Sequence, residues 1–170
     1  MEKKTNIVLI GMPGCGKSTL GVLVAKALGL DFEDTDLVIQ HKTGRMLYKI
    51  VEQDGKEAFL DIECESILST QFENCVVATG GSAVLREKAM QHLKKSGVVV
   101  YLKLPYTSVK RRIRNIKTRG IAFGEGETLL DLYRERCPLY EKYADVTVEC
   151  KGRNTEQNVE DILRLTRGLI

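Results

Sequence analysis

The sequence lacks any apolar run long enough to cross a membrane. A membrane-spanning helix needs roughly 18 to 20 mostly apolar residues, and the 170-residue chain contains no such stretch. The N-terminal segment MEKKTN leads directly into a short apolar run, without the apolar region and cleavage site of a signal peptide. We therefore expect a cytoplasmic protein that does not bind membranes.

The chain also lacks a strong excess of charge. Its 26 Lys and Arg residues and 23 Asp and Glu residues leave a net charge of +3 at pH 7, which is too small to indicate binding to nucleic acid. The basic residues do gather in KRRIRNIKTR (110–119). Such a run is usually the solvated face of a helix, but here it leads into a polar, glycine-rich segment.

Cysteine and histidine lack the spacing of a metal site. Five cysteines are scattered through the chain without a CxxC pair, and neither histidine stands at a ligand spacing from them. This pattern is typical of reduced thiols in the cytosol. Internal repeats, low-complexity segments and linkers are missing as well. We therefore expect one domain, residues 1–170, which is long enough to bury a core without disulfides.

Short apolar runs alternate with segments of helical periodicity. Strands are expected at 6–10, 31–34, 75–79, 98–104 and 145–150. Most of these runs are unbroken, which is typical of strands covered on both faces. Helices are expected at 17–28, 86–96, 128–143 and 155–168. The alternation predicts parallel β-α-β units, and hence a layered α/β sandwich.

The segment GMPGCGKST (11–19) follows the first apolar run and fits the pattern G-x-x-x-x-G-K-[ST]. Its glycines allow backbone N–H groups to turn inward around phosphate oxygens, and the following helix adds the positive end of its dipole. Lys17 places a charge near the β and γ phosphates, and Ser18 offers a hydroxyl to Mg²⁺. This P-loop predicts a nucleoside triphosphate site, with contacts from Gly14, Cys15, Gly16, Lys17, Ser18 and Thr19.

The P-loop does not identify the reaction, because GTPases, motor ATPases and small-molecule kinases share it. The chain has no N-K-x-D guanine-binding motif. A kinase also needs carboxylates, and EDTD (33–36) places Asp34 and Asp36 at the end of the second strand, where open α/β sheets bind ligands. One carboxylate can hold the water shell of a metal while the other accepts a proton. Alternatively, one of them caps the next helix, and both roles can coexist.

Two further segments contain glycine. In ATGGSAV (78–84), Gly80 and Gly81 allow close backbone approach, so their N–H groups could face a substrate, although an ordinary strand-to-helix turn has the same pattern. The polar segment around 115–127 is typical of a mobile lid that excludes water. Its arginine, Arg119, could stabilise a phosphoryl group during transfer.

These motifs together resemble the shikimate kinase family over nearly the whole chain. The motifs are GMPGCGKST, DTD, GKEAF, TGGSAV, a lid arginine, RERCPLY and a final GRN. The resemblance implies a P-loop kinase with a three-layer α/β/α sandwich, a five-stranded parallel sheet of order 2-3-1-4-5 and a mobile lid. It also implies transfer of the γ-phosphate of ATP to the 3-hydroxyl of shikimate, with Mg²⁺, in aromatic amino-acid biosynthesis. We expect a monomer.

The resemblance also implies roles for individual residues. Lys17, Asp36 and Arg119 would be catalytic, and Ser18 and Asp34 would serve the metal. The substrate-binding residues would be Asp36, Gly81 and Arg136, with Arg136 as one of two arginines on the substrate carboxylate. Arg112 and Arg153 would line the adenine site.

The sequence departs from the family pattern at several positions, of which Leu60 matters most. Leu60 stands where the family has the second substrate arginine, and Ser82 replaces the third glycine of TGG. A leucine cannot replace the charged hydrogen bonds of an arginine. Lys56 and Arg45 are candidate replacements. Otherwise the substitution is tolerated, the acceptor is a different small hydroxylated molecule, or the chain is a catalytically weak ATP-binding sensor.

Overall fold

The computed structural model describes residues 4–113 and 119–170, so part of the predicted lid, residues 115–118, lies outside the described residues. The centre of the fold is a parallel sheet of β1 (Asn6–Ile10), β2 (Asp31–Asp34), β3 (Cys75–Ala78), β4 (Gly97–Lys103) and β5 (Val146–Glu149). The strand order is β2-β3-β1-β4-β5. This confirms the order 2-3-1-4-5 that the resemblance implied.

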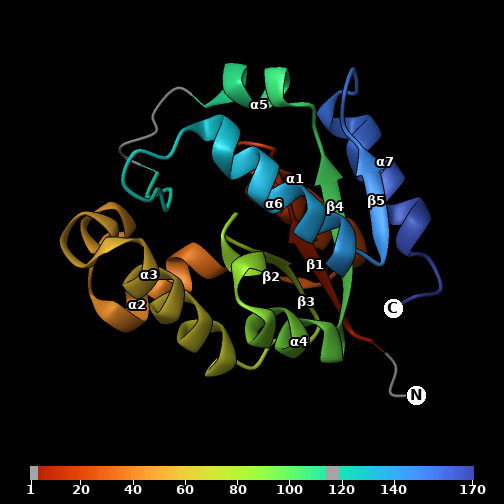
Figure 1. Cartoon of the computed structure of the whole chain (residues 1–170). Helices are drawn as coiled ribbons and strands as arrows, with labels where there is room; N and C mark the ends of the chain where they lie inside the picture. The colour runs from red at the N-terminus through yellow and green to blue at the C-terminus, as the bar shows by residue number, and fades with distance from the viewer. Residues whose placement is uncertain (1–3, 114–118) are drawn as a thin grey trace.

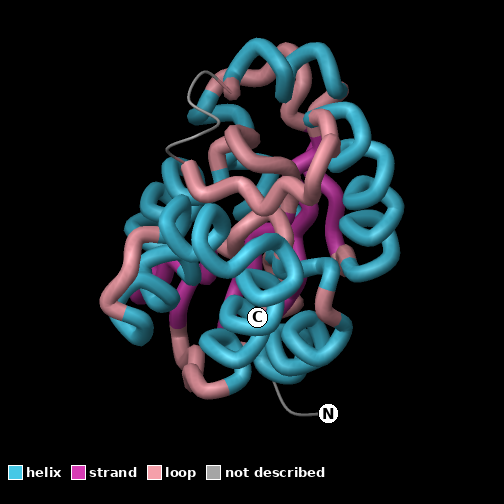
Figure 2. Tube along the Cα trace, turned by 60° about the vertical axis from the view of Figure 1, so that its left-hand side comes forward, coloured by secondary structure: helices cyan, strands magenta, loops and turns pink. Residues whose placement is uncertain are grey.

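Helices cover both faces of the sheet. On one face lie α1 (Lys17–Leu28) and α7 (Thr155–Thr166), and on the other lie α4 (Glu87–Ser96) and α6 (Leu129–Tyr143). Figure 1 shows this three-layer arrangement, and Figure 2 shows the strands enclosed between helices. No helix within the described ranges is both long and apolar enough to span a bilayer.

The burial of the strands explains their sequences. β1 is wholly buried and pairs with both β3 and β4, so that Ile7 is level with Val76 and Val98. Buried strands of a parallel sheet read as continuous apolar runs, as these do. β2 is an edge strand whose residues are exposed or half-buried, which explains why the acidic sequence DFED still forms a strand.

Three helices were not predicted from the sequence: α2 (Thr35–Thr43), α3 (Leu47–Leu68) and α5 (Tyr106–Arg112). In Figure 1, α2 and α3 lie together at one side of the sheet, and residues 119–128 pass close to α3. α3 bends at Gly55, where φ is 85° and ψ is 172°, a conformation that favours glycine. A second, smaller core fills this region, with Ile39, Leu47, Ile50, Phe59, Leu60 and Ala122.

Because all the strands run in parallel, their carboxyl ends meet at one edge of the sheet. The P-loop follows β1, Asp34 ends β2, and the turn at 79–82 follows β3. Ligands of open α/β sheets bind at this edge. The functional residues predicted from these three segments are therefore brought together by the fold.

Candidate functional site

The P-loop wraps closely around the start of α1. Gly11 has a φ of 150°, and a Cβ atom there would lie 2.8 Å from the backbone oxygen of Leu102. Gly16 has a φ of 100° and forms the N-cap of α1. Glycine is needed at both positions because an L side chain rarely adopts these angles. The positive end of α1 is therefore left open to an anion.

Lys17 is held at the base of this loop. Its ammonium donates hydrogen bonds to the backbone oxygen of Gly11 at 2.7 Å and to that of Met12 at 3.0 Å. The residue is 8% exposed and borders the cavity in front of the loop. These two bonds fix the position of its charge before any phosphate binds.

Ser18 and Asp34 form a pair of oxygen ligands beside the loop. The Ser18 hydroxyl donates to Oδ2 of Asp34 at 2.8 Å, and Oδ1 of Asp34 accepts from the backbone N–H of Asp36 at 3.0 Å. Asp34 is thus the N-cap of α2, as one sequence interpretation expected, while its second oxygen remains beside Ser18. A hydroxyl and a carboxylate are ligands that suit Mg²⁺, which keeps most of its waters.

A cavity of about 400 Å³ opens between the P-loop, the turn after β3 and residues 119–122. Its phosphate side consists of loop residues together with Lys17, Ser18 and Thr19. Its opposite side carries Asp36, Phe59, Glu63, Gly81, Ser82 and Arg136. The cavity therefore joins a phosphate-binding end to an end that carries acidic and basic side chains.

Asp36 is half-buried in the wall of this cavity. Removal from bulk water, together with the neighbouring charge of Asp34, raises the pKa of the Asp36 carboxyl to about 6, although Lys17 acts in the opposite direction. A carboxylate of this kind remains ionised at neutral pH and is a better base than an exposed aspartate. The geometry suits a group that accepts a proton from a bound hydroxyl.

Glu63 is a second carboxyl group of the cavity, and it is 1% exposed. The Ser82 hydroxyl donates to its Oε1 at 2.8 Å, while no described residue bonds to Oε2. Burial raises the pKa of Glu63 to about 7. No role was predicted for Glu63 from the sequence, although it stands four residues after Phe59 in the motif GKEAFLDIE, and that spacing places both on one face of a helix.

Arg136 supplies the buried positive charge at the same end. It is 1% exposed, and its Nη2 donates to the backbone oxygen of Ala122 at 3.1 Å. Its Nε has no partner among residues 4–113 and 119–170. A Cβ atom on Gly81 would lie 3.3 Å from its Nη1, so the guanidinium lies against that glycine. An anionic group of a ligand would find a hydrogen-bond donor here.

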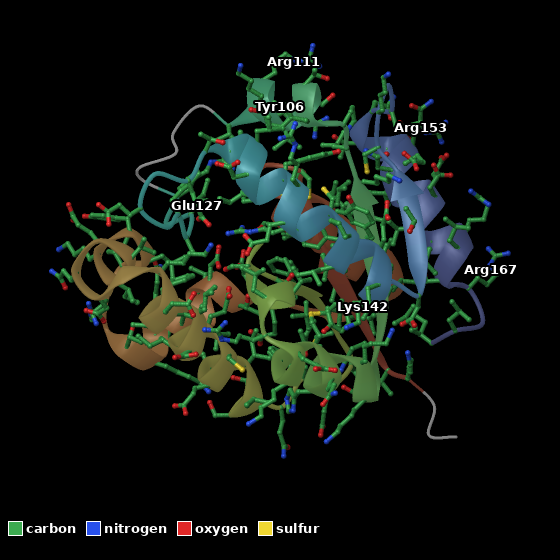
Figure 3. All side chains as sticks on the ribbon, in the orientation of Figure 1. Tyr106, Arg111, Glu127, Lys142, Arg153 and Arg167 are labelled. Atoms are coloured by element: carbon green, nitrogen blue, oxygen red, sulfur yellow. The ribbon has the colours of Figure 1, made fainter. Side chains whose placement is uncertain are left out.

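Arg119 reaches over the P-loop from the described part of the predicted lid. It borders the cavity, and its Nη1 lies 3.6 Å from the position of a Cβ atom on Gly14. Arg112 approaches the same glycine, with its Cβ atom 3.8 Å away. Arg153, however, pairs with Asp161 at 2.8 Å and lies beside β5 and α7 in Figure 3. Of these three arginines, Arg119 borders the cavity, whereas Arg112 and Arg153 do not.

Leu60 does not border the cavity, although its place in the motif predicted a position in the acceptor site. It is 2% exposed and packs in the smaller core between α2 and α3, one residue away from the helix face that carries Phe59 and Glu63. The two candidate replacements, Lys56 and Arg45, do not border the cavity either. Lys56 bonds to Glu127 at 2.8 Å, and Arg45 bonds to Asp54 at 2.7 Å, so opposite charges hold both away from the cavity.

Two backbone contacts also differ from the expectation. Cys15 is 1% exposed, and its N–H donates to the backbone oxygen of Met12 at 3.1 Å. This N–H therefore stabilises the turn of the P-loop and does not point toward a phosphate. The N–H of Gly80 donates to Oγ1 of Thr35 at 3.0 Å and does not face the cavity freely. Gly81 borders the cavity, and its backbone oxygen accepts from Tyr140 at 2.6 Å.

Comparisons with known proteins agree with this geometry. The family model for shikimate kinase matches residues 13–167. A shikimate kinase of Thermodesulfovibrio yellowstonii is 41% identical over 162 residues, which cover 94% of this chain and 93% of the relative. The structure of a shikimate kinase from Acinetobacter baumannii in complex with shikimate superimposes with a TM-score of 0.86 at 34% identity, covering 96% of this chain and 93% of that one. A shikimate kinase from Aquifex aeolicus gives a TM-score of 0.79 at 30% identity, covering 96% of both chains. The chain belongs to the shikimate kinase family.

Proposed function

We propose that the protein transfers the γ-phosphate of ATP to the 3-hydroxyl of shikimate. One observation carries this proposal: the cavity that begins at the P-loop ends at a carboxyl group, Asp36, and a buried guanidinium, Arg136. A hydroxylated acid matches both groups, because its hydroxyl can meet the carboxylate while its own carboxylate meets the arginine. Family membership and the shikimate bound to the Acinetobacter baumannii enzyme support this choice of acceptor.

Asp36 is the residue that we assign to the acceptor hydroxyl. Its carboxylate accepts the hydroxyl proton as the hydroxyl oxygen forms its bond to the γ-phosphorus and the bond between that phosphorus and ADP breaks. Binding both substrates in one cavity makes the reaction effectively unimolecular, which removes a large part of its barrier. Gly81, at the wall of the same cavity, is the proposed backbone contact of the acceptor.

The charges of the transferring phosphoryl group are assigned to two cations. Lys17 lies at the base of the P-loop, and Arg119 reaches over Gly14 from the opposite side. Fixed charges of this kind stabilise the transition state without reorganising during the reaction. Ser18 and Asp34 are the residues that would hold Mg²⁺, and the ion would neutralise further charge on the phosphates.

A coupled assay of ADP release tests the proposal. Purified protein with ATP and Mg²⁺ should release ADP in proportion to added shikimate, with a Michaelis constant of roughly 1 μM to 1 mM. A panel of small alcohols and hydroxy acids, assayed in parallel, should give much lower turnover. Turnover on another member of that panel without turnover on shikimate would contradict the proposal and identify a different acceptor.

A matched variant links the activity to the cavity. Asp36→Asn keeps the size of the side chain but removes the base, so ATP should still bind while ADP release falls. If the wild-type protein binds ATP but releases no ADP with any acceptor of the panel, the proposal is wrong and the chain acts as an ATP-binding sensor.

A further inference from the structure

Glu63 is a buried carboxyl group without a cationic partner. No lysine or arginine of the described ranges lies within ion-pair distance of it. Its Oε1 is held by the Ser82 hydroxyl at 2.8 Å, and its Oε2 lies 2.5 Å from the position of a Cβ atom on Gly80, at the turn that lines the cavity. A buried ionised carboxylate in such a place would be costly, because burial disfavours the charged form.

The charged groups around Glu63 do not offset this effect. Asp36 of α2 faces it across Gly80 and disfavours a second negative charge. Arg136 of α6 and Arg86, which follows the turn after β3, act in the opposite direction. Arg86, however, pairs with Glu57 and Asp61, and Arg136 is turned to the backbone oxygen of Ala122. Burial prevails, and the pKa of Glu63 rises to about 7.

The hydrogen bond with Ser82 occupies one of the two oxygens of Glu63. Oε1 is paired with the hydroxyl at 2.8 Å, so Oε2 is the oxygen that is left without a partner and can donate to a ligand when it carries the proton. Oε2 and the Nε of Arg136 both lack partners among the described residues, and both side chains border the same end of the cavity. A ligand carboxylate has two acceptor oxygens, and these two groups are the donors that could meet them.

We propose that Glu63 binds the carboxylate of the acceptor as a neutral carboxylic acid, donating its Oε2–H beside the guanidinium of Arg136. Ser82 is the positioning residue that holds Oε1 and leaves Oε2 free to donate. This inference rests on the proposed function, because it names the groups that recognise the carboxylate of the same acceptor. The acceptor site thus takes a small acid through one charged donor and one neutral donor.

The inference predicts that acceptor binding depends on pH. Raising the pH ionises Glu63, removes the donor and places a negative charge beside the bound carboxylate. Above the pKa of about 7, the dissociation constant for the acceptor should rise by about tenfold per pH unit, the slope expected when binding requires one proton. Conversely, binding at pH 8 should draw close to one proton from solution.

Calorimetry measures this proton directly and requires no turnover. Shikimate is titrated into ATP-free protein at pH 8 in two buffers of different ionisation enthalpy, with wild type and Glu63→Gln. The wild type should take up close to one proton more than the variant. The exposed Glu65, two residues further along α3, provides the matched control, and Glu65→Gln should behave as the wild type. Equal proton uptake by wild type and Glu63→Gln would overturn the inference.

The pH dependence of the Michaelis constant for shikimate is the second readout. Glu63→Gln keeps a donor, its amide N–H, at all pH values, so its constant should stay level from pH 6.5 to 8.5 while that of the wild type rises. Ser82→Ala should raise this constant several-fold at pH 6.5 and leave kcat nearly unchanged. A wild-type constant that is level or falls with pH would show an ionised Glu63 and contradict the inference.

Failure of this inference differs from failure of the proposed function. Wild-type turnover on shikimate at pH 6.5 tests the function, whereas the pH profile tests the role of Glu63. If the Glu63→Gln variant does not fold, the titration of the wild type in two buffers still tests the inference. A wild type that takes up no proton on binding shikimate at pH 8 would show that Glu63 does not bind it as a neutral donor.

Discussion

Replacing Glu63 by glutamine should change how the stability of the fold depends on pH. The pKa of this carboxyl is about 7 in the folded protein, against an ordinary value of 4.5. Since the folded state holds the proton more tightly than the unfolded chain, the stabilisation is complete below pH 4.5 and is lost as the pH rises to about 7. The difference corresponds to about 3 kcal/mol, from 1.36 kcal/mol for each pKa unit.

Urea unfolding at pH 5 and pH 8 measures this pH-dependent contribution of Glu63 to the free energy of unfolding. Wild type and the Glu65→Gln control should both lose stability between the two pH values, and Glu63→Gln should lose about 2–3 kcal/mol less. With a slope near 2 kcal/mol per molar urea, this is a difference of about 1–1.5 M in the midpoint shift. Asp36 titrates in the same range, but it is unchanged in all three proteins.

The reasoning would be refuted if Glu63→Gln lost as much stability between pH 5 and pH 8 as the wild type. That result would mean that Glu63 has an ordinary pKa in the folded protein, and hence that its burial is relieved by water or by a cation. An unchanged slope of the urea transition is the control for two-state unfolding, because a changed slope would indicate a change in the states themselves.

Asp36→Asn should lower kcat by roughly 10²- to 10⁴-fold, the usual contribution of a general base, and an unchanged kcat would contradict its role. Arg119→Ala should lower kcat by about 10³-fold with a similar Michaelis constant for the acceptor; an effect on that constant alone would place Arg119 on the acceptor. Ser18→Ala should raise the Mg²⁺ concentration needed for half-maximal activity, whereas the same requirement in the variant would exclude it as a ligand. Leu60→Ala should lower the free energy of unfolding by about 2–5 kcal/mol in urea titrations, whereas Leu68→Ala, at the exposed end of α3, should cost less than about 0.5 kcal/mol. Equal losses would show that Leu60 is not packed.

Contacts within a short segment were the part of the site that the sequence could predict. The P-loop is contiguous, so its glycines, Lys17 and Ser18 could be recognised from their spacing together with the strand before and the helix after. The two interpretations of Asp34 were also local, and each is consistent with one of its oxygens. The three central strands β1, β3 and β4 were found because buried strands of a parallel sheet are apolar throughout, whereas the edge strands β2 and β5 are partly exposed and carry acidic residues.

Contacts between distant segments could not be predicted in the same way. Leu60 was expected in the acceptor site, because a motif gives an order of residues but not the rotation of the helix that carries them. Glu63 and Ser82, which form a hydrogen bond, are 19 residues apart in sequence. Each could be placed in a family motif, but the motifs do not show that the two side chains are in contact. Lys56 was predicted to be available to a ligand, but in the structure it bonds to Glu127, 71 residues further along the chain.

The bond from Arg136 to the backbone oxygen of Ala122 joins the residues to which we assign the acceptor and the nucleotide. The guanidinium borders the cavity, and Ala122 belongs to the same short segment as Arg119, which reaches over the P-loop. A movement of Arg136 or of the segment that contains Ala122 therefore changes the geometry of the hydrogen bond between them. Because binding free energies are reciprocal, the factor by which the acid changes the dissociation constant of the nucleotide equals the factor by which the nucleotide changes that of the acid.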